Sequence, residues 1–208
     1  MNGNPAEPPE ERPDFNELTA VFARERLEAP GALADVPFGK GSRVAIGGAP
    51  GAGATRLLRE VVAVVADKHP DVALSVVLVG ARPEELTDWT SGDGAAVSGG
   101  SFDRSSEVQA QAAELAVERA KRVVERGGDA LVVIDSLESL PAGVARRVFG
   151  SARNVEDGGS LTVVAATGMA LDPLRQASTH IALDAPAEDG APQVSAARSL
   201  TLRADLLK

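Results

Sequence analysis

Short apolar runs alternate with segments of helical periodicity along most of this chain, and this alternation constrains the fold more than any other feature. The runs Arg43–Ile46, Ala73–Val79, Ala130–Asp135 and Leu161–Ala166 consist mostly of Val, Leu, Ile and Ala, as buried strands require. Strands that alternate with helices pair in parallel, because each connecting helix returns the chain to the same edge of the sheet. We therefore predict an α/β fold in which helices flank a mainly parallel sheet.

The predicted helices lie between these runs. Helical spacing of apolar residues indicates Thr55–Asp67, Pro83–Trp89, Ser105–Arg126 and Val144–Ala152. The third helix has the clearest ends, because Ser105 or Ser106 can cap its start and Gly127 can end it. Four of its apolar residues are expected to form one buried face: Val108, Ala112, Leu115 and Ala116.

The remaining segments carry weaker signals. Short strands are predicted at Ala95–Ser98, His180–Leu183 and Ser199–Leu202, with a flexible turn over Pro186–Pro192. Met1 to about Pro13 is rich in Pro, Glu and Asn, which predicts a disordered tail before a single domain over 14–208. Phe15–Leu33 indicates a short helix and connecting segments, so the ordered core is expected to begin at Pro37.

Composition excludes several classes of function. The chain has no cysteine and only two histidines, His69 and His180, so disulfide frameworks and thiolate or histidine-rich metal sites are not expected. No apolar run approaches the ~18 residues of a membrane span, and the N-terminus does not resemble a secretion signal. We therefore expect a cytoplasmic protein with no membrane partner. The net charge of −9 argues against RNA as a partner, because it opposes binding to a phosphate backbone.

A glycine-rich loop joins the first predicted strand to the first predicted helix. Its eight residues, Gly48–Thr55, match the phosphate-loop pattern G-x-x-x-x-G-K-[ST] at every position except the lysine, which is Ala54. In such a loop the backbone N–H groups and the helix N-terminus point at an anion. The expected cofactor-binding residues are Gly48, Pro50, Gly51, Ala52, Gly53, Ala54, Thr55 and Arg56.

The missing lysine limits what this loop can do. Lysine normally reaches the β- and γ-phosphates and neutralises charge as the bond breaks, which alanine cannot do. Arg56 lies about 100° further round the helix, so Arg56 or Arg59 would have to reach back to replace the lysine. The alternative interpretation is an ordinary glycine turn between a strand and a helix.

Asp135 closes a predicted buried strand and is followed by Ser136. An acid at this point is the second half of a phosphate-binding pair, in which it holds Mg²⁺ together with the loop threonine. The predicted metal site is therefore Thr55 and Asp135, with ATP or ADP and Mg²⁺ as the expected cofactors. The alternative is an aspartate that only caps the next turn.

Further motifs occur over most of the chain in the order of one known family. They are Arg12–Thr19, Pro37–Arg43, His69–Asp71, Arg82–Thr87, Ser101–Asp103, Glu118–Glu125, Ile134–Ser136, Phe149–Thr162 and Arg198–Leu207. These segments resemble the ATPase domain of the transcription termination factor Rho, a hexameric RNA translocase, from about Arg12 to Leu207 with gaps. The resemblance implies a RecA-like P-loop NTPase core in a shortened, degenerate form.

Two departures from that family bear on catalysis. The family's loop lysine is Ala54 here, and the resemblance places its catalytic glutamate, which polarises the attacking water, at Ala81. A general base is worth roughly 10²–10⁴ in rate, so its loss alone would bring hydrolysis towards background. The resemblance matches Arg203 with an arginine that acts on a neighbouring subunit's nucleotide, and Arg82 with another interface arginine. Both could instead be solvated surface charges.

Other departures bear on RNA. The family's two RNA-contacting loops are shortened here, between Leu140 and Val148 and over Gly168–Ala177. Its adenine-holding aromatic has no counterpart near Gln193–Arg198, and its RNA-binding barrel is expected to be missing. RNA translocation is therefore the least expected activity.

Three functions remain open. The first is a degenerate Rho-like protein that binds nucleotide weakly and acts through protein partners, in its own ring or among Rho subunits, with Arg203 acting on a neighbour. The second is a minimal RNA-acting ATPase, for which Arg56, Arg59 or Glu84 would be indispensable. The third is a structural or interaction protein that binds no nucleotide.

Overall fold

The computed structural model describes residues 13–90, 95–156, 158–168 and 173–208. The predicted tail over residues 1–13 therefore lies outside the described residues except for Pro13, and part of the second shortened loop, residues 169–172, lies outside them as well. Within the described residues, no helix is long and apolar enough to cross a membrane.

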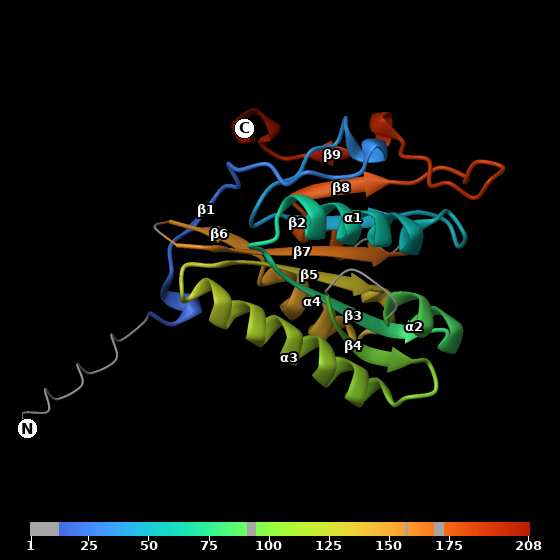
Figure 1. Cartoon of the computed structure of the whole chain (residues 1–208), viewed down its shortest axis with the longest axis horizontal. Helices are drawn as coiled ribbons and strands as arrows, with labels where there is room; N and C mark the ends of the chain where they lie inside the picture. Colours follow the sequence, from blue (N-terminus) through green and yellow to red (C-terminus); the bar gives the residue numbers. More distant parts are fainter. Residues whose placement is uncertain (1–12, 91–94, 157, 169–172) are drawn as a thin grey trace, which may run out of the picture.

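One sheet forms the centre of the molecule (Figure 1). Its spatial order is β4 (Ala96–Ser101), β3 (Ala73–Ala81), β5 (Asp129–Asp135), β7 (Ser160–Thr167), β2 (Arg43–Gly47), β8 (Thr179–Ala182) and β9 (Leu200–Thr201). The first six of these strands pair in parallel, and β9 pairs antiparallel to β8. The predicted mainly parallel sheet is thus confirmed.

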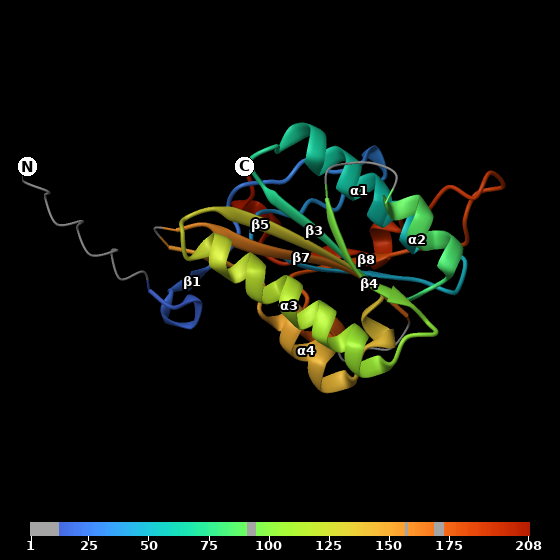
Figure 2. The same ribbon diagram turned by 60° about the horizontal axis from the view of Figure 1, so that its bottom comes forward.

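Helices cover both faces of the sheet (Figures 1 and 2). One face carries α1 (Ala54–Lys68) and α2 (Pro83–Thr90), and the other carries α3 (Ser106–Val124) and α4 (Ala142–Gly150). Side chains alternate along each strand. Val76 and Leu78 of β3 therefore pack on the α1 side, and Val77 and Val79 on the α3 side. Two buried faces explain why these strands are apolar throughout.

Short 3₁₀ helices complete the chain: η1 (Phe15–Glu17), η2 (Gly31–Leu33), η3 (Leu137–Ser139), η4 (Pro173–Gln176), η5 (Ala196–Arg198) and η6 (Ala204–Leu206). Only Leu140 and Pro141 separate η3 from α4, so the segment between Leu140 and Val148, predicted to be a shortened loop, is mostly the start of α4. The helix α4 begins two residues before the predicted start at Val144, because Pro141 already occupies its N-cap.

The predicted buried face of α3 was right for Ala116 and wrong for Val108 and Leu115. Val108 and Leu115 are 47% and 52% exposed, whereas the face on the sheet carries Gln109, Ala110, Ala113, Ala116, Val117, Ala120 and Val124. Small side chains let a helix lie close to a sheet, and four of the seven residues on the inner face are alanines. The predicted ends are confirmed, since the Ser105 hydroxyl accepts from the Val108 N–H and Gly127 has a φ of 79°.

The N-terminal segment enters the core earlier than predicted. Phe15, Leu27 and Leu33 are each at most 1% exposed, so the core does not begin at Pro37. The strand β1 (Ala20–Val21), which was not predicted, pairs antiparallel with β6 (Arg153–Val155), and β6 pairs with β7. Strands of two and three residues leave almost no periodic signal, so only the folded partner makes them visible.

Candidate functional site

A cavity of about 810 Å³ lies at the edge of the sheet where β2, β3, β5 and β7 end. Residues 48–55 form one wall, and Gly80, Asp135 and Thr167 come from the ends of the other strands. Parallel sheets commonly bind ligands at the carboxyl ends of their strands, where the connecting loops can approach a ligand. All eight predicted cofactor-binding residues line this cavity.

The backbone of the glycine loop suits an anion. Gly51 and Gly53 have φ values of 83° and 92°, a conformation that glycine adopts without strain. Gly53 is the N-cap of α1 and offers no capping side chain. Within the described residues, the N–H groups of Gly51, Gly53 and Ala54 have no hydrogen-bond acceptor. Unpaired donors at a helix N-terminus attract negative charge.

Thr55 and Asp135, the two residues of the predicted metal site, both line the cavity and lie within hydrogen-bond reach of each other. Burial raises the pKa of the Asp135 carboxyl above its usual value, and the Thr55 hydroxyl, as a hydrogen-bond partner, partly lowers it again. The nearby negative charges of Glu85 and Glu138 raise this pKa further, while the positive charge of Arg59 lowers it. A hydroxyl and a carboxylate are ligands that suit Mg²⁺.

Within the described residues, no group of three or more His, Asp and Glu side chains is arranged to hold a metal. A Mg²⁺ ion at Thr55 and Asp135 would therefore take its other ligands from water and from the phosphates that it accompanies, as is usual for this ion. The residues present fit a metal–phosphate complex better than a free cation.

The charged lining is slightly acidic. Three arginines, Arg56, Arg59 and Arg82, share the cavity with four acids, Glu85, Asp88, Asp135 and Glu138. Two of the arginines are already paired, Arg56 with Glu60 at 3.3 Å and Arg59 with Asp88 at 3.4 Å. An anion that enters this cavity therefore meets less positive charge than it would meet if residue 54 were a lysine.

The two positions where the resemblance places catalytic residues differ in their surroundings, because Ala54 lines the cavity and Ala81 does not. Ala81 ends β3 at 8% exposure and packs in the core under α1, while its neighbours Gly80 and Arg82 line the cavity. Glu84, considered above as a substitute base, does not line the cavity. Glu85 does, and its carboxylate accepts a hydrogen bond from the Arg82 N–H at 3.0 Å, so it caps the start of α2.

Glu138 is a cavity residue that the sequence reasoning missed. It lies in η3, three residues after Asp135, and any side chain at residue 168 would overlap its carboxylate. Its position just after β5 was the available signal, because residues that follow parallel strands gather at this edge.

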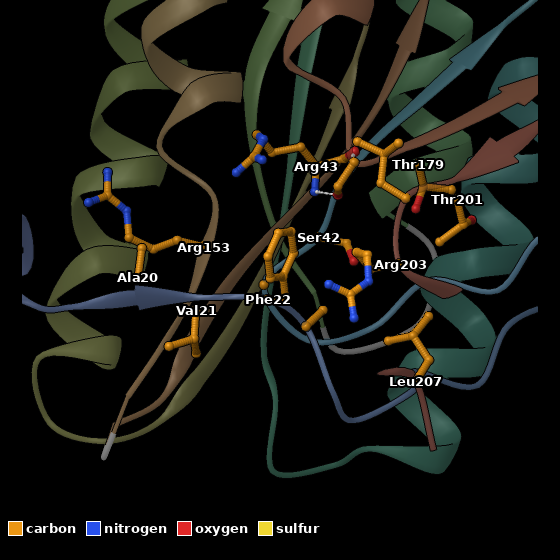
Figure 3. Close-up of a pocket in the computed structure, with 14 residues that line it drawn as sticks. Ala20, Val21, Phe22, Ser42, Arg43, Arg153, Thr179, Thr201, Arg203 and Leu207 are labelled. Atoms are coloured by element: carbon orange, nitrogen blue, oxygen red, sulfur yellow. Dashed lines mark hydrogen bonds between the residues drawn. The ribbon is translucent and has the colours of Figure 1, made fainter. Parts of the chain in front are cut away.

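Arg203 lies in a different hollow, of about 260 Å³, beside β1 and β9 (Figure 3). Its guanidinium pairs with Asp205 at 3.1 Å and stacks on the ring of Phe22 at 5.4 Å. Arg203 therefore does not reach the cavity of its own chain.

The fold and the cavity together define the α/β core of a RecA-like P-loop NTPase. A solved structure described as a prototypical ATPase from the type III secretion system of pathogenic bacteria matches 98% of this chain and 68% of its own, with a TM-score of 0.71 and 17% sequence identity. No protein-family model matches the chain.

Within that class, the chain is a homologue of transcription termination factor Rho. The Rho of Streptosporangium roseum is 41% identical over 183 residues, covering 74% of this chain and 48% of the relative. The Rho proteins of Streptomyces lividans and Mycobacterium tuberculosis are 38% and 36% identical, each over 196 residues and 79% of this chain. The chain spans 28% and 33% of those two relatives, so it corresponds to less than half of each.

Proposed function

We propose that this chain is a degenerate Rho-like ATPase domain that binds ATP or ADP with Mg²⁺ weakly, hydrolyses it poorly or not at all, and acts through protein contacts. The proposal is supported by a cavity that holds groups suited to phosphate and Mg²⁺ but has alanine at the two positions where the resemblance places the lysine and the catalytic glutamate. The unpaired loop N–H groups and the Thr55–Asp135 pair are present, while alanine occupies positions 54 and 81.

Binding and hydrolysis need different groups here. Loop amides and a helix N-terminus stabilise bound phosphate whether or not a bond breaks. Mg²⁺, when bound, would neutralise phosphate charge beside Thr55 and Asp135. Hydrolysis additionally needs a base and a cation aimed at the leaving phosphate, and these are worth roughly 10²–10⁴ and 10²–10³ in rate. Their absence at Ala81 and Ala54 supports binding without efficient turnover.

Thermal unfolding with and without millimolar ATP and Mg²⁺ tests the binding. A ligand that binds only the folded state at 100 times its Kd stabilises by about 2.7 kcal/mol. In a chain of this size that raises Tm by roughly 5–10 °C. The rise should vanish in Asp135→Asn, which keeps the shape of the side chain and removes its charge. An unchanged Tm at saturating ligand would refute nucleotide binding and favour the structural alternative.

Turnover is measured separately by phosphate release from radiolabelled ATP. We expect a rate close to that without protein. Rapid hydrolysis that Asp135→Asn abolishes would instead support the minimal ATPase, and Glu138→Gln and Glu85→Gln would then show which carboxylate replaces the missing base.

The edge of the sheet at β9 favours the protein-contact part of the proposal. Phe22, Leu200 and Leu202 are 59%, 60% and 53% exposed there, around Arg203. Figure 3 shows Phe22 and Arg203 beside one another in the lining of the hollow. Large exposed apolar side chains beside the last strand of a sheet are typical of an interaction surface. The proposed partners are further copies of this chain or Rho subunits in a ring.

Sedimentation of the chain alone, and mixed with a purified Rho, tests these contacts. Leu202→Glu should abolish any assembly. Leu115→Glu is the matched control, because Leu115 is equally exposed, at 52%, but lies on the outer face of α3. A chain that stays monomeric under both conditions would contradict the ring.

A further inference from the structure

Arg59 stands out among the arginines of the cavity by its position on α1. It follows Thr55 by four residues, so both side chains lie on the same face of the helix. Helical side chains lean towards the N-terminus, which tilts Arg59 back towards the loop. Its charge acts on the buried Asp135 carboxyl, whose pKa it lowers. The positive charge of Arg59 therefore reaches the end of the cavity where the metal site is predicted.

Packing holds the guanidinium of Arg59 in place. It lies 5.4 Å from the ring of Trp89, which is 6% exposed, and its Nη1 is 3.4 Å from the Asp88 carboxylate. A stacked arginine loses less freedom when it forms further hydrogen bonds, because its plane is already set.

The same packing leaves donors unpaired. Within the described residues, Nε of Arg59 and Nε1 of Trp89 are both buried and have no hydrogen-bond partner. Nearly all buried polar groups in folded proteins are paired, so two unpaired N–H donors in one stacked pair of side chains require an explanation. Both groups can only donate. Arg59, unlike Trp89, lines the cavity, so a phosphate oxygen bound there would give its guanidinium an acceptor.

The other arginines are placed for different tasks. Arg56 binds Glu60 and also donates to the Asp189 carbonyl at 3.3 Å, so it ties α1 to the turn over residues 186–192. Arg82 is exposed at the start of α2, where its backbone N–H is held by Glu85. Neither combines a buried guanidinium nitrogen, an aromatic support and a common face with Thr55.

We propose that Arg59 is the phosphate-binding cation of this cavity and holds the terminal phosphates of a nucleoside di- or triphosphate, the task of the lysine that Ala54 replaces. This inference rests on the proposed function, because it names the residue that holds the ligand of that same site. Arginine is suited to the task, since its planar fork binds phosphate oxygens in pairs.

Ligand binding would exchange one anion for another at Arg59. Asp88 is 62% exposed, so its carboxylate returns to water at little cost when the guanidinium turns to a phosphate. The exchange explains why the arginine sits in a loose pair at 3.4 Å beside the cavity. It also means that Asp88 competes with the ligand and weakens its binding.

Titration calorimetry of the full chain with Mg·ATP and, separately, with magnesium pyrophosphate tests this role. Arg59→Gln should weaken both ligands by about 10-fold or more, the usual range for a charge-assisted hydrogen bond to phosphate. Arg59→Lys should recover part of the loss. Lys68→Gln is the matched control, because it removes one positive charge from the far end of the same helix, outside the cavity, and should change affinity by less than about twofold. Equal affinity in the wild type and in Arg59→Gln would overturn the inference.

A second pair of variants decides the matter if Arg59→Gln does not fold. Asp88→Asn frees Arg59 and should tighten Mg·ATP by about 3–10-fold, while Glu60→Gln removes the same charge, frees Arg56 and should leave the affinity unchanged. Equal effects of these two variants would overturn the inference. Binding of pyrophosphate but not ATP, still dependent on Arg59, would refute the nucleotide proposal alone. Binding of neither ligand would refute both.

Discussion

Replacing Ala54 with lysine should convert a weak phosphate site into a stronger one. Ala54 lines the cavity in the first turn of α1, where a long side chain has open space before it. An ammonium about 4 Å from a phosphate oxygen, at an effective dielectric constant of ~20, gains about 4 kcal/mol. Loss of lysine rotamer freedom and of its hydration offsets roughly half of that gain. A net gain of about 2 kcal/mol corresponds to about 30-fold tighter binding of Mg·ATP.

The same substitution should slightly destabilise the free protein. A positive charge in the first turn of a helix opposes the helix dipole, which costs about 0.3–1 kcal/mol. The variant should therefore unfold at a lower temperature than the wild type without ligand and gain more from Mg·ATP. A lower Tm without ligand together with a larger rise in Tm on adding Mg·ATP distinguishes a contact with phosphate from a general stabilisation of the fold.

The assay combines titration calorimetry with thermal unfolding at matched ligand concentrations. Ala54→Met is the control, because it adds a side chain of similar length without charge. An affinity for Ala54→Lys within about threefold of that for Ala54→Met would refute the electrostatic reasoning. Turnover should stay near background in Ala54→Lys, because no base has been added.

Three further predictions follow from the fold and the site. Burial raises the pKa of the Asp135 carboxyl above its usual 3.8. Between 3.8 and the raised pKa the folded state therefore binds more protons than the unfolded state. The free energy of unfolding thus falls as pH rises through that window. Asp135→Asn should therefore raise the Tm of the ligand-free protein at pH 7, which a pH series of thermal melts measures; a lower Tm would contradict the assigned shift. Mg·ATP needs the ionised carboxylate, so its affinity in the wild type should fall as pH drops through the same window, and a flat calorimetric profile would remove Asp135 from the site. Gly41→Ala should destabilise by more than about 1 kcal/mol in urea unfolding, because φ is 87° and a methyl group would overlap the Asn154 backbone; a neutral effect would show that the β6 connection can move.

The sequence alone determined the parts of this protein that depend on contiguous residues. The loop Gly48–Thr55 carries its strand, its glycines and its helix start within one stretch, so its position at the sheet edge could be predicted. Asp135 could be predicted for the same reason, because the acid directly follows a buried strand and parallel strands end at one edge. The mainly parallel sheet followed from apolar runs that are buried on both faces.

Tertiary structure alone decided what depends on distant partners. Periodicity placed Val108 and Leu115 on the buried face of α3, but the structure exposes both and packs Ala110, Ala113 and Ala116 against the sheet. The strands β1 and β6 exist only through their pairing with each other and with β7. The choice between Arg56 and Arg59 could not be made from spacing, since both lie near the loop. That choice depends on the contacts of Arg59 with Trp89 and Asp88 of α2. Contacts between side chains of two different helices cannot be predicted from the residue spacing within either helix.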